Sequence, residues 1–219
     1  SATMDLPRYL AQFFDPVNIT QGYRPVQGMY MYLLYHLFDF NPDGYHLAHN
    51  SLHAGNAVLF FLLIERLTKR LRLAFVAAVV YAVLPNYSLA IFWHAVVDPL
   101  SGFFYLLTLW LWTTFLQTKR VRDYVVTFAS FVFALLSKEI AIFLPLFMFL
   151  IQWWFYGEKP DLRRDIPRYG LFLITVIPYL YQVYLVQSRG EFVGQFGFRI
   201  GSHMLNNLIP YMAILAFPW

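Results

Sequence analysis

Apolar residues in this chain gather into long runs, and short polar or basic segments separate these runs. Six runs cover residues 45–64, 71–91, 100–116, 124–136, 140–156 and 169–186, and a seventh begins at residue 203 and continues to 219. A helix needs about 20 mostly apolar residues to cross a bilayer core about 30 Å thick, and lipid-exposed backbone must form helices or a closed barrel. The pattern predicts an all-α fold, a polytopic transmembrane helix bundle of about six to seven spans, whose short fourth span is tilted or irregular.

A shorter apolar segment at residues 26–40 precedes these runs, and it carries Tyr30, Tyr32 and Tyr35. It is too short to cross a bilayer, and tyrosine rings favour the headgroup region, so it is expected to lie in the interface. The predicted organisation is an outer loop with an interfacial helix at 1–44 and a transmembrane helical module at 45–219, incomplete at both ends.

The composition agrees with lipid as the main solvent of the chain. Hydrophobic residues make up 59% and charged residues 13%, against about 25% charged residues in a soluble domain. The sequence has no cysteine, which excludes a disulfide framework and a thiolate metal site. The net charge of +4 arises in the turns between apolar runs and does not indicate a nucleic-acid partner.

The basic residues predict the orientation of the bundle, because short basic loops stay on the cytoplasmic side. Eleven of the sixteen follow the first, third and fifth runs: Arg66, Lys69, Arg70, Arg72, Lys119, Arg120, Arg122, Lys159, Arg163, Arg164 and Arg168. These loops alternate along the chain, as a bundle of six spans requires. Outside these three loops, the charged residues are of mixed sign and are predicted to fall on the outer side.

A polar stripe lies in the stretch YHLAHNSLHAGNAV at the start of the first run. Spacings of three, four and seven place most of its polar residues on one helical face: His46, His49, Asn50, His53 and Asn56. The stripe extends about 16 Å from Tyr45 toward the membrane. It is interpreted as a cavity wall for polar substrate groups, as a two-histidine metal site, or as interhelical hydrogen bonding.

Two further groups also fall at the ends of apolar runs. His94 and Asp98 are four residues apart, so on a helix the carboxylate could act as a base or orient an acceptor, or Asp98 could simply cap a helix beside Pro99. Lys138 and Glu139 interrupt two apolar runs. They are interpreted either as a turn in the headgroup region or as a phosphate-binding cation with Glu139 as its orienting partner.

Arg24 lies just before the interfacial segment, where it either contacts a phosphate or extends to lipid headgroups. With it, the motifs stand in the order YRPV at 23–26, NPDGYHLAHNSLHAGNAVL at 41–59, Asp98, and SKEIAIFLPL at 137–146. In these motifs the chain resembles the GT-C superfamily of membrane glycosyltransferases. The resemblance is to the protein O-mannosyltransferase-like branch, which includes the transmembrane and tetratricopeptide-containing transferases and bacterial relatives.

The resemblance implies a module of about seven membrane helices that transfers a sugar from a polyprenyl-phosphate donor to an acceptor. It implies inversion at the anomeric carbon and a site on the periplasmic or luminal side of the bacterial inner membrane or endoplasmic reticulum. It implies no certain cofactor or metal ligand, although a divalent metal is possible. The implied roles are Arg24 and Lys138 at the donor phosphate, Asp98 and Glu139 in catalysis, and His46, Asn50, His53 and His94 at the sugar and acceptor.

One feature of the resembling family is not matched by this chain. Those proteins carry a catalytic acid in the first outer loop, whereas only Asp5 and Asp15 precede Arg24 here. The chain is therefore expected to be either a piece of a longer transferase or a remnant without catalysis. The second alternative is a non-catalytic transmembrane scaffold subunit of a larger membrane complex, in which the histidines could ligate a pigment or haem.

The predicted topology can be tested in the cysteine-free background. Single cysteines at Thr118 and Asp161 should be shielded from a membrane-impermeant thiol reagent in intact cells, because both positions are predicted to be cytoplasmic. Cysteines at Gln21 and Gln187 should react under the same conditions. Labelling at Thr118 without permeabilisation would overturn the orientation.

Overall fold

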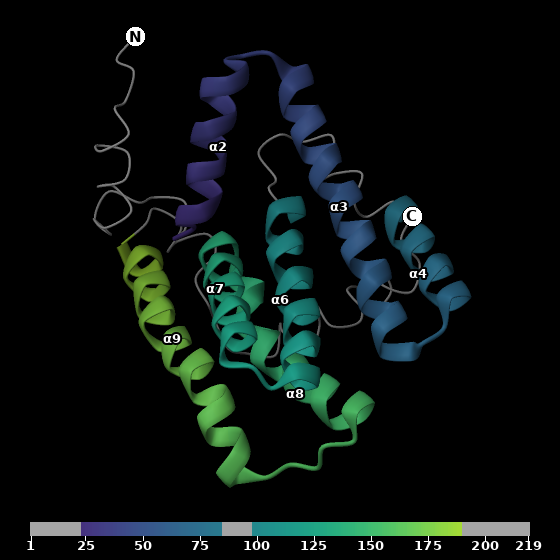
Figure 1. Ribbon diagram of the computed structural model, residues 1–219. Helices are drawn as coiled ribbons and strands as arrows, with labels where there is room; N and C mark the ends of the chain where they lie inside the picture. The colour runs from purple at the N-terminus through teal and green to yellow at the C-terminus, as the bar shows by residue number, and fades with distance from the viewer. Residues whose placement is uncertain (1–22, 85–97, 190–219) are drawn as a thin grey trace, which may run out of the picture.

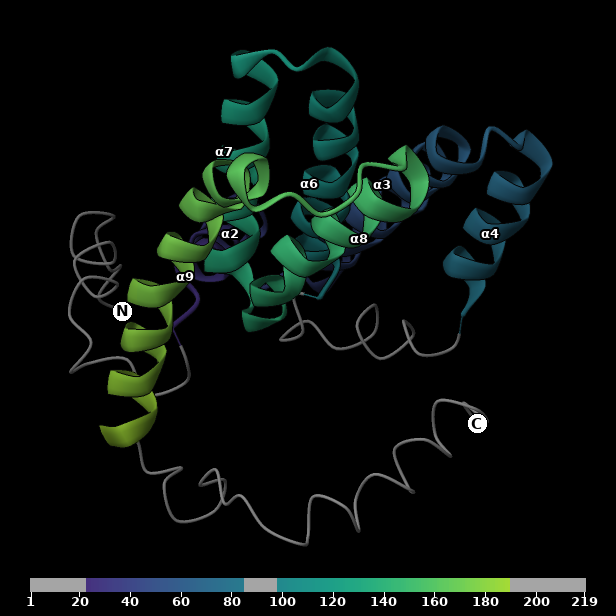
Figure 2. The same cartoon turned by 90° about the horizontal axis from the view of Figure 1, so that it is seen from below.

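The computed structural model describes residues 23–84 and 98–189, and every regular element in these two ranges is a helix. The chain runs through α2 (Pro25–Phe38), α3 (Pro42–Thr68), α4 (Leu71–Val83), α6 (Asp98–Thr118), α7 (Val121–Ser137), the 3₁₀ helix η2 (Glu139–Phe143), α8 (Leu144–Tyr156) and α9 (Leu162–Arg189). Both views place α4 and α9 on opposite flanks, with α6, α7 and α8 between them (Figures 1 and 2). The predicted all-α architecture is confirmed for the described ranges.

Local sequence explains where the long helices begin and end. The side chain of Asn41 accepts a hydrogen bond from the backbone N–H of Asp43, and Pro42 occupies the first turn, so α3 starts with a capped end. Lys69 ends α3 in the left-handed region at φ 57°. Gly157 ends α8 at φ 65°, a conformation that glycine adopts without steric cost.

The core of the bundle is an aromatic cluster between α6, α7 and α9. Trp112, Phe131 and Phe172 are each fully buried, and the ring of Phe172 lies 5.1 Å from that of Phe131 and 6.1 Å from that of Trp112. The indole N–H of Trp112 donates to the carbonyl of Met148 in α8 at 3.0 Å. Aromatic packing therefore fixes α6, α7, α8 and α9 as one unit.

Helices α3 and α6 run parallel, and their contacts show where one lies along the other. Asn56 donates to the carbonyl of Pro99, and Arg66 donates to the carbonyl of Trp110. Asn56 lies 14 residues beyond the start of α3 at Pro42, so the start of α3 extends about 21 Å past the start of α6. Helix α2 runs back alongside this extension (Figure 1), and we call the pair the α2–α3 hairpin.

The predicted spans correspond to helices, but the structure bears out only part of the span count. Helix α3, helix α6 and the combined segment Glu139–Tyr156 are long and apolar enough to cross a membrane, and α4 is a shorter apolar helix within the described residues. Helices α7 and α9 match the predicted fourth and sixth runs in position. The run at 203–219 and the last third of the run at 71–91 lie outside the described residues, so six to seven spans remain a prediction.

Large apolar side chains cover the outside of the helices, as expected of a protein solvated by lipid. Trp154 is 79% exposed, Val83 is 71% exposed and Phe75 is 62% exposed. The chain is an integral membrane protein on this criterion and on the length of its apolar helices. Helix α2 is confirmed as a helix that packs against α3 and α7, while its depth in the membrane remains a prediction.

The three basic turns lie together at one end of the bundle, which we call the basic end (Figure 1). The ammonium of Lys119, in the α6–α7 turn, bonds Glu158 of the α8–α9 loop at 2.6 Å. Arg66, one of the basic residues that predict the orientation, stacks on the ring of Trp110 at 4.4 Å and bonds the hydroxyl of Thr114 at 2.5 Å. Some of the basic residues on which the predicted orientation rests therefore also hold helices together.

A hydrogen-bond network at the basic end joins α8 to α9. Asp165 is 9% exposed and accepts hydrogen bonds from Gln152 at 2.9 Å and from Arg164 at 2.9 Å. The hydroxyl of Tyr169 donates to the same Gln152 side chain at 2.8 Å. Burial alone would raise the pKa of Asp165, but hydrogen bonds from Arg164, the backbone of Asp161 and Gln152 outweigh it and lower the pKa to about 2.

Asp165→Asn should destabilise the bundle at neutral pH and lose most of that effect in acid. A carboxyl whose pKa falls from 3.8 to about 2 on folding contributes about 2 kcal/mol above the unfolded pKa, and this is lost as the pH falls from about 5 to about 2. Thermal unfolding of the detergent-solubilised protein at pH 7 and pH 3 should show a melting-temperature gap between wild type and variant that narrows in acid. Asp43→Asn, at an exposed position, is the control; an equal gap at both pH values would contradict the assignment.

Candidate functional site

Two ion pairs at the opposite end of the bundle bring together four of the residues singled out in the sequence. The guanidinium of Arg24 makes a bidentate contact with Glu139, Nε to Oε1 at 3.1 Å and Nη2 to Oε2 at 2.9 Å. The ammonium of Lys138 donates to Oδ1 of Asp98. We call this end, defined by Arg24, Asp98, Lys138 and Glu139, the site end.

The pairing follows from the backbone between α7 and η2. Lys138 adopts an extended conformation, φ −161° and ψ 147°, between two helical segments. Successive side chains of extended backbone point to opposite sides. Lys138 therefore reaches the start of α6, while its neighbour Glu139 reaches the residue that precedes α2.

This pairing differs from the sequence interpretation, which made Glu139 the orienting partner of Lys138. In the structure each of these neighbours is held by a residue far away in sequence, 115 positions away for Glu139 and 40 for Lys138. Sequence adjacency is a poor guide here because the extended residue turns the two side chains apart.

The ion pairs are half-buried at the ends of apolar helices. Side-chain exposures are 32% and 31% for Arg24 and Glu139, and 33% and 39% for Lys138 and Asp98. A charge in such a position is costly unless a partner compensates it. Here two cations meet two carboxylates, so the set is neutral as a whole and each charge remains open to solvent on one side.

Sequence reasoning missed Tyr179 of α9, which lies beside the first ion pair. It is 4% exposed, and its ring lies 6.1 Å from the ring of Tyr23, the residue before Arg24. The hydroxyl has no hydrogen-bond partner among the described residues. The signal in the sequence is weak, because a tyrosine in an apolar run is also common at the membrane interface.

The polar stripe of α3 has both buried and exposed members. His49 and His53 are buried, and their rings bond the backbone carbonyls of Tyr45 at 2.8 Å and of Ala82 at 3.1 Å. His46 is partly buried, whereas Asn50 is exposed and lies off the buried face. His94 lies outside the described residues, so its proximity to Asp98 remains a prediction.

Asn56 links the stripe to the ion pairs. It is 1% exposed, and its amide donates to the carbonyl of Pro99, the residue after Asp98, at 2.8 Å. A side chain added at Gly102 would meet the Asn56 amide at 3.1 Å, so α3 and α6 approach closely at this point. The buried face of the stripe therefore starts at the level of the ion pairs and continues outward along α3.

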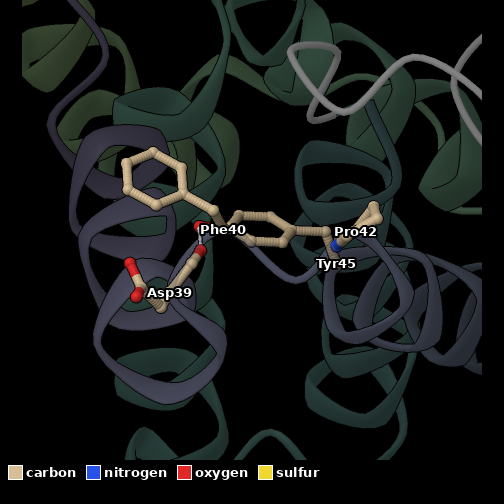
Figure 3. A pocket seen from close by; sticks show the side chains of 4 residues that line it. All are labelled: Asp39, Phe40, Pro42 and Tyr45. Carbon is tan, nitrogen blue, oxygen red and sulfur yellow. Dashed lines mark hydrogen bonds between the residues drawn. The ribbon is translucent and has the colours of Figure 1, made fainter.

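A shallow pocket lies at the tip of the α2–α3 hairpin, away from the ion pairs. It has a volume of about 220 Å³ and is lined by Asp39, Phe40, Pro42 and Tyr45, whose hydroxyl bonds the carbonyl of Asp39 at 2.9 Å (Figure 3). Across residues 23–84 and 98–189, no three His, Asp or Glu side chains lie close enough together to hold a metal ion.

An integral membrane bundle with a cluster of paired charges at one end defines a class of helical membrane proteins rather than one activity. Comparison with known families identifies the family within this class. Residues 24–182 of the 219 match the model of the dolichyl-phosphate-mannose-protein mannosyltransferase family, so the chain belongs to that family. No curated protein and no solved structure gives a significant match.

Charge exchange should test the first ion pair directly. Arg24→Glu or Glu139→Arg alone places like charges in contact and should cost about 2 kcal/mol of stability, whereas the double variant restores the pair and most of the melting temperature. The matched control combines Arg24→Glu with Asp98→Lys, which leaves the new carboxylate beside Glu139 and should not restore stability. Equal recovery in both double variants would contradict the pairing.

Proposed function

We propose that the chain is the membrane module of a glycosyltransferase that takes its sugar from a polyprenyl-phosphate donor. Its membership of the mannosyltransferase family supports glycosyl transfer in a membrane. The observation that carries the proposal is the convergence of Arg24 and Lys138, each held by an acid, at one end of an apolar bundle.

The two cations suit the donor phosphate. Lys138 and Glu139 are neighbours in the chain, so both ion pairs lie at the α7–η2 junction, and the proposal assigns both cations to the phosphate of one bound donor. A guanidinium fork binds phosphate oxygens in the same bidentate way as it binds Glu139, and an ammonium adds a point charge. The carboxylates hold the cations in place before the donor binds.

The geometry favours different roles for the two acids. Both oxygens of Glu139 are engaged by Arg24, which makes it a poor base and a good positioning residue for the guanidinium. Asp98 uses Oδ1 for Lys138 and lies at the start of α6, where its other oxygen can accept a proton. We assign Asp98 as the general base and Glu139 as the residue that orients Arg24.

The proposed reaction is a single inverting displacement. Asp98 accepts the proton of an acceptor hydroxyl while the oxygen of that hydroxyl attacks the anomeric carbon of the sugar. The bond from that carbon to the phosphate oxygen breaks, and the electron pair leaves with the polyprenyl phosphate. Arg24 and Lys138 stabilise the negative charge where it develops on the leaving group.

The site end lies opposite the basic turns, so the charge bias supports catalysis on the periplasmic or luminal face. In this arrangement the polyprenyl tail lies in lipid beside the apolar helices. His46, Asn50, His53 and His94 keep their proposed places on the sugar or acceptor side, which the direction of α3 outward from Asn56 supports.

The experiment is turnover of dolichyl-phosphate mannose by the full-length protein in membranes. Asp98→Asn should lower kcat about 100-fold or more because it removes the base. Arg24→Met and Lys138→Met should each weaken donor binding, and the double variant should lose less than the sum of the two free energies, because groups that contact one phosphate are coupled. Arg120→Met, a basic-end substitution, is the control and should keep wild-type turnover.

Strictly additive free-energy losses in the Arg24→Met and Lys138→Met variants would contradict binding of both cations to one phosphate. Wild-type turnover rates in both Asp98→Asn and Glu139→Gln would show that neither acid acts in the site. The scaffold alternative predicts a different result. A purified complex without transferase activity, carrying haem or pigment bound at His46, His49 or His53, would support it.

A further inference from the structure

Buried polar atoms without a partner gather in the α2–α3 hairpin. In the described part of the chain, four such atoms are Oε1 of Gln27, the hydroxyl of Tyr30, Nε2 of His49 and Oδ1 of Asn56. The side chains of His49 and Asn56 are 2% and 1% exposed. Such groups oppose folding unless something pairs with them, so four in one place call for an explanation.

The four atoms belong to facing sides of two helices. Gln27 and Tyr30 follow Arg24 at steps of three residues and so continue its face of α2. His49 and Asn56 are seven residues apart on one face of α3. The rings of Tyr30 and His49 meet edge to face at 5.6 Å, which joins the two faces.

Both faces lead back to the ion pairs. On α2, Tyr30 lies about 9 Å outward from Arg24, and on α3, His49 lies about 10 Å outward from Asn56. Asn56 is bonded to Pro99, beside Asp98. The unpartnered atoms therefore lie on two faces that start at the level of the ion pairs and meet about 10 Å outward, at the contact between Tyr30 and His49, and we call these two faces the track.

The chemistry of the track differs from that of the ion pairs. Its groups are an amide oxygen on each helix, a phenol and an imidazole nitrogen, all of which donate or accept hydrogen bonds. Such groups match hydroxyls, which both donate and accept, whereas a phosphate is served by Arg24 and Lys138. One turn beyond His49, on the same face of α3, Tyr45 opens into the pocket at the hairpin tip (Figure 3).

We propose that Gln27, Tyr30, His49 and Asn56 form a subsite for a neutral, hydroxyl-bearing group next to the phosphate-binding cations. The proposal rests on the proposed function and adds four binding residues to it. The hydroxyls come either from the sugar of the lipid-linked donor or from the acceptor, and both have the same hydrogen-bonding chemistry.

The test compares two lipids that differ only in the sugar. Binding of dolichyl-phosphate mannose and of dolichyl phosphate is measured on the full-length protein in nanodiscs, for wild type, Gln27→Met and Tyr30→Phe. Each substitution removes an atom that has no hydrogen-bond partner among residues 23–84 and 98–189, so the melting temperature should stay the same or rise. Affinity for the mannosyl lipid should fall about three- to tenfold, while affinity for dolichyl phosphate stays unchanged.

Tyr124→Phe is the matched control, because its hydroxyl donates to the carbonyl of Arg168 at 2.9 Å at the basic end. It should lower the melting temperature without changing the preference between the two lipids. Lys138→Met should weaken both lipids alike. Together these variants separate a sugar contact from a phosphate contact and from a loss of folding.

The outcomes distinguish this subsite from the proposed function. A wild-type protein that binds neither lipid contradicts both the subsite and the proposed function. The subsite alone is contradicted if the wild type binds both lipids and the Gln27→Met and Tyr30→Phe variants change neither the lipid affinities nor the KM of a serine- and threonine-containing peptide acceptor. An unchanged lipid preference with a raised peptide KM supports the subsite and assigns its hydroxyls to the acceptor.

Discussion

Charge compensation at the junction of α7 and η2 is the constraint on which the arrangement of the site end depends. Lys138 and Glu139 stand between two apolar segments, where an unpaired charge is costly. The extended backbone of Lys138 sends the two charges in opposite directions, so two separate partners are required. Arg24 and Asp98 supply them, and in doing so they fix the start of α2 and the start of α6 against one point.

The basic end contributes to the same geometry from the other side of the bundle. Lys119 and Arg168 both bond Glu158, which ties the α6–α7 turn to the α8–α9 loop and to α9. Between the ends, Trp112 and Phe172 hold the helices at a fixed distance. The position of Lys138 is thus set by a rigid unit, and a donor phosphate would meet cations whose separation is already determined.

The sequence predicts the helices well because the physical signal is strong. Apolar runs of about 20 residues match the length of a helix that crosses a bilayer, and the runs at 45–64, 100–116 and 140–156 all lie within helices of the structure. The alternation of basic loops also predicts correctly that the basic turns gather at one end. Both features depend on local composition, which the sequence states directly.

The pairing within the site could not be predicted in the same way. Arg24 and Glu139 are 115 residues apart, and nothing local to either residue identifies the other. Tyr179 is one tyrosine among 16 in the chain, and only the approach of α9 to Tyr23 distinguishes it. Side-chain pairing depends on the orientation of whole helices, and the apolar pattern leaves that orientation open.

The contact between Asn56 and Pro99 changes how the polar stripe should be understood. From the sequence alone the stripe is predicted to run from the outer surface into the membrane, but the depth of its inner end relative to the ion pairs is not defined. Because Asn56 lies level with the start of α6, the histidines lie outward of the ion pairs rather than deep in the bundle. A lipid-linked sugar has the same order of parts, an apolar tail, a phosphate and a polar head. The structure offers apolar helices, then two cations, then hydrogen-bonding groups in that order, so the donor that we propose would meet each layer in a single orientation.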